Sequence, residues 1–81
     1  MLEQLLAKKG FEKLLNKRDV IFLKKQEGVD IIVRLTNLYG STIRCRVYFN
    51  QDQKASTTFW EPEDKAMFNT IMEICSQNMK T

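Results

Sequence analysis

The segment VDIIVRLTNLYGSTIRCRVYF, residues 29–49, decides the fold. Its second half alternates strictly between two sets of side chains, which are Ile43, Cys45, Val47 and Phe49 against Arg44, Arg46 and Tyr48. This period of two is typical of a β-strand that buries one face. Tyr39-Gly40-Ser41 interrupts the pattern and reads as a tight turn. We therefore predict two antiparallel strands, over residues 29–38 and 42–49.

Further strand candidates lie on both sides of this pair of predicted strands. Residues 19–25 form a further strand candidate, and Glu27-Gly28 follows as a tight turn. Residues 54–60 are rich in Thr and aromatic side chains, after a polar loop over residues 50–53. Such short connections are typical of successive antiparallel strands. The sequence predicts a four-stranded antiparallel meander in the order 1-2-3-4.

A helix is expected at the C-terminal end, over residues 62–78. Apolar residues recur there every three or four positions, at Met67, Phe68, Ile71, Met72, Cys75 and Met79. Pro62 suits a first helical turn, and the neighbouring acidic residues favour the positive end of the helix dipole. Three Met residues on this stripe would suit an adaptable groove, but they are more typical of a core.

A second helix is expected over residues 1–17, which are rich in Leu, Lys, Glu and Gln. The apolar residues of this segment form two nearly opposite stripes, one with Leu2, Leu5 and Leu6 and the other beyond Gly10. Either the helix breaks at Gly10, which we favour, or it continues and offers the leucines to another chain. A small core also favours a partner, so we predict a homodimer or larger assembly through Leu2, Leu5 and Leu6.

Together these elements predict one two-layer α+β domain over residues 1–81, with both helices on the same face of the sheet. The chain contains no His, and it carries no phosphate-binding glycine loop, Cys-x-x-Cys pair or nucleophile motif. Two Cys residues are too few for a disulfide framework and read as buried free thiols. The sequence predicts a protein that is not an enzyme, needs no metal or cofactor, and lies in the cytoplasm.

The face of the sheet away from the helices is the candidate binding surface. If Ile31, Val33 and Leu35 point at the helices, Arg34, Arg44, Arg46 and Tyr48 share the other face, and Trp60 joins them if Phe59 points inward. Net charge is +3, and residues 1–60 hold eleven basic and six acidic side chains, so the excess of basic charge lies in these first 60 residues. The predicted binding residues are Arg34, Arg44, Arg46, Tyr48, Trp60 and Lys24.

Arginine grips phosphate in a bidentate manner and aromatic rings stack on bases, so the leading hypothesis is RNA or single-stranded DNA binding. The alternative is a protein–protein module, such as a small inhibitor or adaptor, because Tyr, Trp and Arg are also favoured interface anchors. A merely solvated face would carry the same residue types.

The order of helix, strands and helix resembles that of double-stranded-RNA-binding domains and of the small Alu-RNA-binding subunits of the signal recognition particle. The resemblance covers element order alone. Double-stranded-RNA-binding domains carry a Lys cluster at the start of their last helix, where this chain has Glu61, Glu63 and Asp64. No residue role is carried over from either family.

Overall fold

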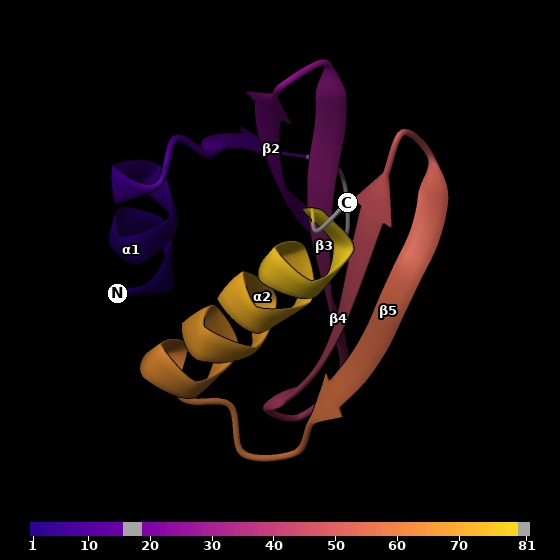
Figure 1. The fold of residues 1–81 in the computed structure, drawn as a ribbon. Helices are drawn as coiled ribbons and strands as arrows, with labels where there is room; N and C mark the ends of the chain where they lie inside the picture. Colours follow the sequence, from indigo (N-terminus) through magenta and orange to yellow (C-terminus); the bar gives the residue numbers. More distant parts are fainter. Residues whose placement is uncertain (16–18, 80–81) are drawn as a thin grey trace.

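The fold is an α+β arrangement of one antiparallel sheet and two helices, in a computed structural model that describes residues 1–15 and 19–79 (Figure 1). The helices are α1 (Leu2–Lys8) and α2 (Asp64–Met79), at the two ends of the chain. The strands between them are β1 (Glu12–Leu15), β2 (Asp19–Gln26), β3 (Val29–Tyr39), β4 (Thr42–Phe49) and β5 (Asp52–Phe59).

The sheet has five strands in the order β1-β2-β3-β4-β5, and every neighbouring pair is antiparallel. The antiparallel meander is confirmed, but the predicted count of four strands is wrong because β1 was expected to be helical. The four predicted strands correspond to β2 through β5, and no predicted strand end differs from the observed end by more than two residues. Glu27 and Gly28 both have positive φ, as a two-residue hairpin turn requires.

Both helices pack on one face of the sheet, as predicted. The core contains side chains from α1, from α2 and from the inward positions of the strands, including Leu6, Ile71, Phe22, Val33 and Val47. The predicted inward set on β3 and β4 is confirmed, because all of its members are either buried or packed against this core. The second face carries no helix in the described part of the chain, and we call it the open face.

The N-terminal segment changes from helix to strand at Gly10. There the backbone N–H of Gly10 donates to Ala7 O, and that of Phe11 donates to Leu6 O. These two bonds form a Schellman motif, which needs a residue of positive φ, and Gly10 has a φ of 94°. Phe11 and Leu6 both lie in the core, which supplies the apolar contact that accompanies such a motif.

The break favoured at Gly10 is therefore confirmed, whereas the helix expected beyond it is wrong. Glu12–Leu15 forms β1 and pairs with β2, so the second apolar stripe belongs to a strand. Leu14 is opposite Ile21 in this pairing and faces the open side. In a strand, successive side chains alternate between the two faces of the sheet, with a period of two instead of 3.6. A short helix followed by a strand therefore accommodates the two apolar stripes that one straight helix could not bury together.

The leucines predicted to face a second chain are mostly used within this one. Leu2 and Leu6 are buried in the core, and Leu5 is half-buried. The prediction of an exposed Leu2/Leu5/Leu6 stripe is wrong, because a seven-residue helix that ends at Lys8 can turn this side onto the sheet. Self-association, if it occurs, needs another surface.

Gly10→Ala should destabilise the fold by about 1–3 kcal/mol, the usual cost of forcing an ordinary residue into a left-handed conformation. The added Cβ would also lie 3.4 Å from Cε of Lys24. Urea denaturation followed by tryptophan fluorescence measures this loss. Ser41→Ala, in the exposed β3–β4 turn, is the control and should change stability by less than about 0.5 kcal/mol. Equal losses in the two variants would contradict the assigned role of Gly10.

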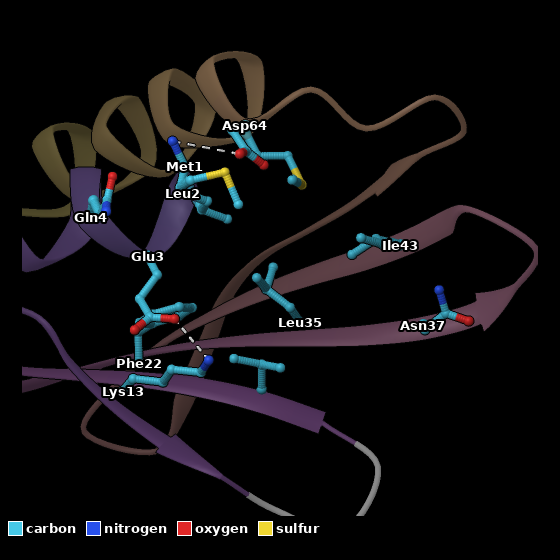
Figure 2. Close-up of a pocket in the computed structure, with 12 residues that line it drawn as sticks. Met1, Leu2, Glu3, Gln4, Lys13, Phe22, Leu35, Asn37, Ile43 and Asp64 are labelled. Atoms are coloured by element: carbon cyan, nitrogen blue, oxygen red, sulfur yellow. Dashed lines mark hydrogen bonds and ion pairs between the residues drawn. The ribbon is translucent and has the colours of Figure 1, made fainter.

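The helix side of the sheet leaves one sizeable cavity, of about 500 Å³, between the sheet and the neighbouring ends of α1 and α2 (Figure 2). Leu2 and Met67 line it from the helices, and Phe22, Leu35 and Ile43 from the sheet.

Neither α1 nor α2 is long and apolar enough to cross a membrane.

Candidate functional site

The open face is defined by strand register. Side chains on this face come from all five strands, and they include Glu12, Leu14, Asp19, Ile21, Leu23, Lys25, Asp30, Ile32, Arg34, Thr36, Arg44, Arg46, Tyr48, Ser56 and Thr58. Of the predicted binding residues, Arg44, Arg46 and Tyr48 lie on β4, and Arg34 lies on β3. The structure therefore brings Arg34, Arg44, Arg46 and Tyr48 together on one surface.

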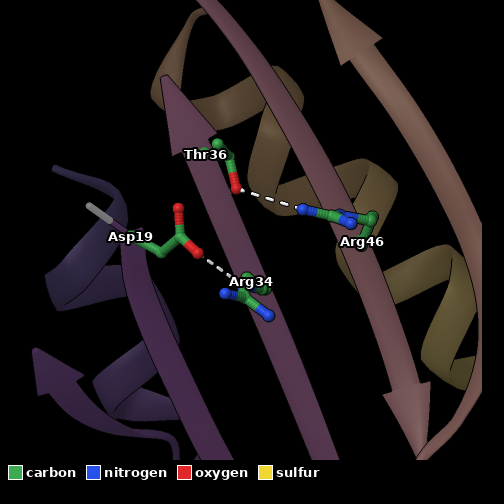
Figure 3. Close-up of polar contacts among 4 residues, drawn as sticks. All are labelled: Asp19, Arg34, Thr36 and Arg46. Carbon is green, nitrogen blue, oxygen red and sulfur yellow. Dashed lines mark hydrogen bonds and ion pairs between the residues drawn. The ribbon is translucent and has the colours of Figure 1, made fainter. Parts of the chain in front are cut away.

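Two arginines face each other directly across β3 and β4, since Arg34 pairs with Arg46 in the register. Like charges directly opposite each other destabilise a sheet. Figure 3 shows how the fold accommodates them, with the helices behind the strands. Arg34 Nε donates to Asp19 Oδ2 from the neighbouring β2, and Arg46 Nη2 donates to the hydroxyl of Thr36 at 3.4 Å.

Of the three arginines on this face, Arg34 alone has a carboxylate partner among the described residues. Asp19 is buried, with 6% of its side chain exposed, and it forms the one ion pair that the described residues make with these guanidinium groups. Arg46 Nε is buried and has no hydrogen-bond partner in the described chain. Buried donors without acceptors are rare in folded proteins, and they often mark the place of an ion or water. The arginine group therefore retains unused capacity for an anion.

The arginines also act on the Asp19 carboxyl. The hydrogen bond from Arg34 holds the pKa of Asp19 below its usual value of 3.8, and the Thr36 hydroxyl lowers it further against the opposing effect of burial. A carboxyl with a lowered pKa in the folded state stabilises the protein above its unfolded pKa, and this contribution disappears as the pH falls through the lowered value. Asp19 should thus contribute fully at neutral pH.

Asp19→Asn should destabilise the protein at neutral pH. The difference from the wild type should begin to shrink below about pH 4, where the carboxyl of the unfolded chain takes up its proton, and it should disappear as the pH falls through the lowered pKa of the folded state. Urea denaturation of both proteins between neutral pH and acid measures this difference. A stability gap that stays constant over the whole range would show that the Asp19 charge does not stabilise the fold.

Arg44, Arg46 and Tyr48 form a row along β4. Neighbours in this row are about 7 Å apart, from a rise of roughly 3.4 Å per residue. Arg44 is exposed, whereas Arg46 and Tyr48 are half-buried by the curved sheet. Arg44 lies opposite Thr36 and Thr58, and Tyr48 lies opposite Ile32. A polar surface with short side chains therefore surrounds the exposed guanidinium.

An exposed aromatic pair lies at one end of the open face. Trp60 follows Phe59, the last residue of β5, whose side chain packs against the core, and it lies beside Tyr39 at this end of the sheet. Its ring centroid is 6.3 Å from that of Tyr39, at a tilted interplanar angle of 58°. Their exposed fractions are 64% and 63%. Tyr39 was not among the predicted binding residues, because it was expected in the turn over residues 39–41.

The register explains how these two rings meet. Tyr39 pairs with Thr42, and Trp60 lies one position beyond the last paired residues, Ile43 and Phe59. Both rings therefore flank Thr42, whose side chain is buried although it faces the open side by parity. The open face thus has aromatic rings at both ends of its β4 row, Tyr48 at one end and Tyr39 with Trp60 at the other.

The β1–β3 side of the open face is apolar instead. Ile21 lies beside Arg34, and Leu23 lies beside Ile32. Leu14 on β1 extends this region to the edge of the sheet and is exposed. The open face therefore divides into an apolar part and an arginine-rich part, which meet at β3.

Lys24 is not part of this surface. It pairs with Ile31, an inward residue, and its ammonium lies 5.7 Å from the centroid of the Phe11 ring on the helix side. The prediction that Lys24 joins the arginines is wrong in its placement, because the parity of β2 turns Lys24 toward the helices. Lys24 instead covers the edge of the core near α2.

The remaining reactive groups are dispersed. Cys45 is buried, and burial raises the pKa of its thiol to about 12. Burial also raises the pKa of the half-buried Cys75, although nearby Lys24 opposes this shift. Thiols of this kind are poor nucleophiles. Within residues 1–15 and 19–79, no three His, Cys, Asp or Glu side chains gather in a way that could hold a metal ion.

Comparison of the chain with protein-family models, with curated proteins and with solved structures finds no match in any of the three. Functional inference for this protein therefore rests on the geometry of the open face.

Proposed function

We propose that the protein is a non-enzymatic binding protein that holds single-stranded nucleic acid, RNA or DNA, on its open face. Its free thiols suit a reducing compartment such as the cytoplasm. The observation that carries the proposal is the direct opposition of Arg34 and Arg46, of which Arg34 alone has a carboxylate partner among the described residues. A polyanion would relieve this repulsion and supply acceptors to the guanidinium groups.

The geometry favours a single strand over a duplex. Arg44 and Arg46 are about 7 Å apart along β4, close to the spacing of successive phosphates in an extended strand. Tyr48 lies beyond them at one end, and Tyr39 and Trp60 lie at the other. Rings at both ends of a cationic row can stack unpaired bases, which a duplex keeps inside its own stack.

Fluorescence anisotropy with labelled single- and double-stranded RNA and DNA tests the proposal. Single strands should bind more tightly than duplexes, and affinity should fall steeply between about 50 and 200 mM salt through counterion release. Absence of binding to all four polymers at low salt would reject the proposal. Tighter binding to either duplex would reject the single-strand geometry.

Trp60→Ala should weaken single-strand binding by about 1–3 kcal/mol, the usual contribution of one stacked base. The slope of log affinity against log salt should not change, because no charge is lost. Folding stability should change little, since most of the Trp60 side chain is exposed. Asn69→Ala, at an exposed position of α2 on the helix side of the sheet, is the control. Equal binding losses in Trp60→Ala and Asn69→Ala would argue against stacking.

A protein partner is the second candidate, and the apolar part of the open face favours it. Leu14, Ile21 and Leu23 form a continuous apolar area next to the arginines, which resembles the apolar centre and Arg-rich anchors of a protein interface. Such binding should depend weakly on salt and should be lost on Ile21→Asp. Arginine substitutions would then lower the affinity, but the slope of log affinity against log salt would change by less than one unit.

A further inference from the structure

A second candidate site lies on the helix side of the sheet, away from the open face. The cavity of about 500 Å³ is bounded by α1, α2 and the sheet, and Figure 2 shows it as a wedge with the helices on one side and the strands on the other. This volume lies within the range of small-molecule sites, roughly 300–1,000 Å³. The cavity is partly open to solvent, so a ligand can enter it.

The walls of the cavity are mainly apolar. Leu2, Phe22 and Met67 are buried around it. The other apolar wall residues of the sheet are only half-buried although they face the helix layer, and these are Val20, Leu35 and Ile43. Apolar surface on the core side of the sheet thus remains open, and a molecule that covered it would gain the free energy of burial.

The charges at the rim are already compensated. Lys13 Nζ lies 2.8 Å from Glu3 Oε1, and the amino group of Met1 lies 3.7 Å from Asp64 Oδ2. Among residues 1–15 and 19–79, an anionic ligand would therefore meet no spare cation at this rim, and a cationic ligand would have to displace one. Gln4 and Asn37 line opposite ends of the cavity (Figure 2). The Asn37 Nδ2 group donates to Gly40 O, so its Oδ1 is left to accept a hydrogen bond from an uncharged polar group.

We propose that this cavity binds an uncharged, mainly apolar small molecule with one hydroxyl group, of the medium-chain alcohol class. The apolar walls take the alkyl chain, and Asn37 Oδ1 at one end accepts a hydrogen bond from the hydroxyl. This site is independent of the proposed nucleic-acid function, because the two surfaces lie on opposite faces of the sheet.

Titration of the full chain with 1-octanol, followed by methyl and amide NMR shifts, tests the site. We expect saturable shifts at cavity residues such as Val20, Leu35 and Ile43, and no shifts at Arg44 or Tyr48. Val20→Phe should fill the cavity and weaken octanol binding by about tenfold or more, equal to about 1.4 kcal/mol. Val29→Phe is the matched control, because Val29 packs against the core but does not line the cavity. It should bind octanol as the wild type does.

Octanoate at neutral pH provides the charge test, since it keeps the alkyl chain and adds one negative charge. We expect it to bind more weakly than octanol by about tenfold or more. Equal or tighter binding of octanoate, unsaturable octanol shifts, or wild-type binding by Val20→Phe would overturn the proposal. If Val20→Phe does not fold, Leu35→Phe replaces it, with the same expected loss.

Discussion

Replacing both Arg44 and Arg46 with Ala should nearly abolish nucleic-acid binding at moderate salt while leaving the protein folded. Each arginine that contacts a phosphate contributes about one unit to the slope of log affinity against log salt, so the slope should fall by about one to two units. Stability should change by less than about 0.5 kcal/mol for the exposed Arg44. Loss of Arg46 removes packing but also relieves its repulsion with Arg34.

A matched control separates this effect from net charge. Lys8→Ala with Lys65→Ala removes the same two charges from exposed positions on α1 and α2, on the far side of the sheet. It should leave most of the affinity and most of the salt slope intact. Asp19→Asn should act in the opposite direction and raise affinity, because it frees Arg34 from its carboxylate partner. Equal losses in the lysine and arginine pairs would assign binding to overall charge.

Leu6→Ala should cause the largest loss of stability, about 2–5 kcal/mol, because Leu6 is fully buried and its removal leaves a cavity. That is a large share of the roughly 5–15 kcal/mol that keeps a domain folded. The loss should be the same at every protein concentration, since Leu6 packs within its own chain. Urea denaturation at several micromolar concentrations measures it.

Leu5→Ala is the control for this prediction, because Leu5 is the half-buried member of the same helix. It should cost clearly less than Leu6→Ala. A loss in Leu6→Ala that depends on concentration would contradict the intrachain packing and return Leu6 to an interface between chains.

The sheet could be predicted from the sequence because its patterns are local. The alternation along residues 42–49 and the glycines at positions 28 and 40 determine strand type and turn position within a few residues. Strand β1 was missed for the opposite reason. Its residues 12–15 are good helix formers, and only their pairing with β2 makes them a strand. Gly10 carried the signal, since a glycine after a helix predicts its end.

The candidate site was predicted in part. Parity placed Arg34, Arg44, Arg46 and Tyr48 correctly relative to the core, because alternation is a property of each strand alone. The role of Asp19 depends on the neighbouring strand, and the contact between Tyr39 and Trp60 joins two strand ends that flank β4. Such contacts across strands require the register, which the sequence did not provide. Lys24 was misplaced because its parity on β2 was not applied.

The most direct test of the proposed function is an NMR titration of the protein with a short single-stranded RNA at low salt. We predict saturable shifts on the open face, at the Arg34, Arg44 and Arg46 Nε–H groups, the Tyr48 amide and the Trp60 indole N–H. Residues of α1 and the exposed side of α2 should remain unshifted. Shifts confined to the helices, or no shifts under conditions where the protein is folded, would contradict the assignment of the open face as a nucleic-acid binding surface.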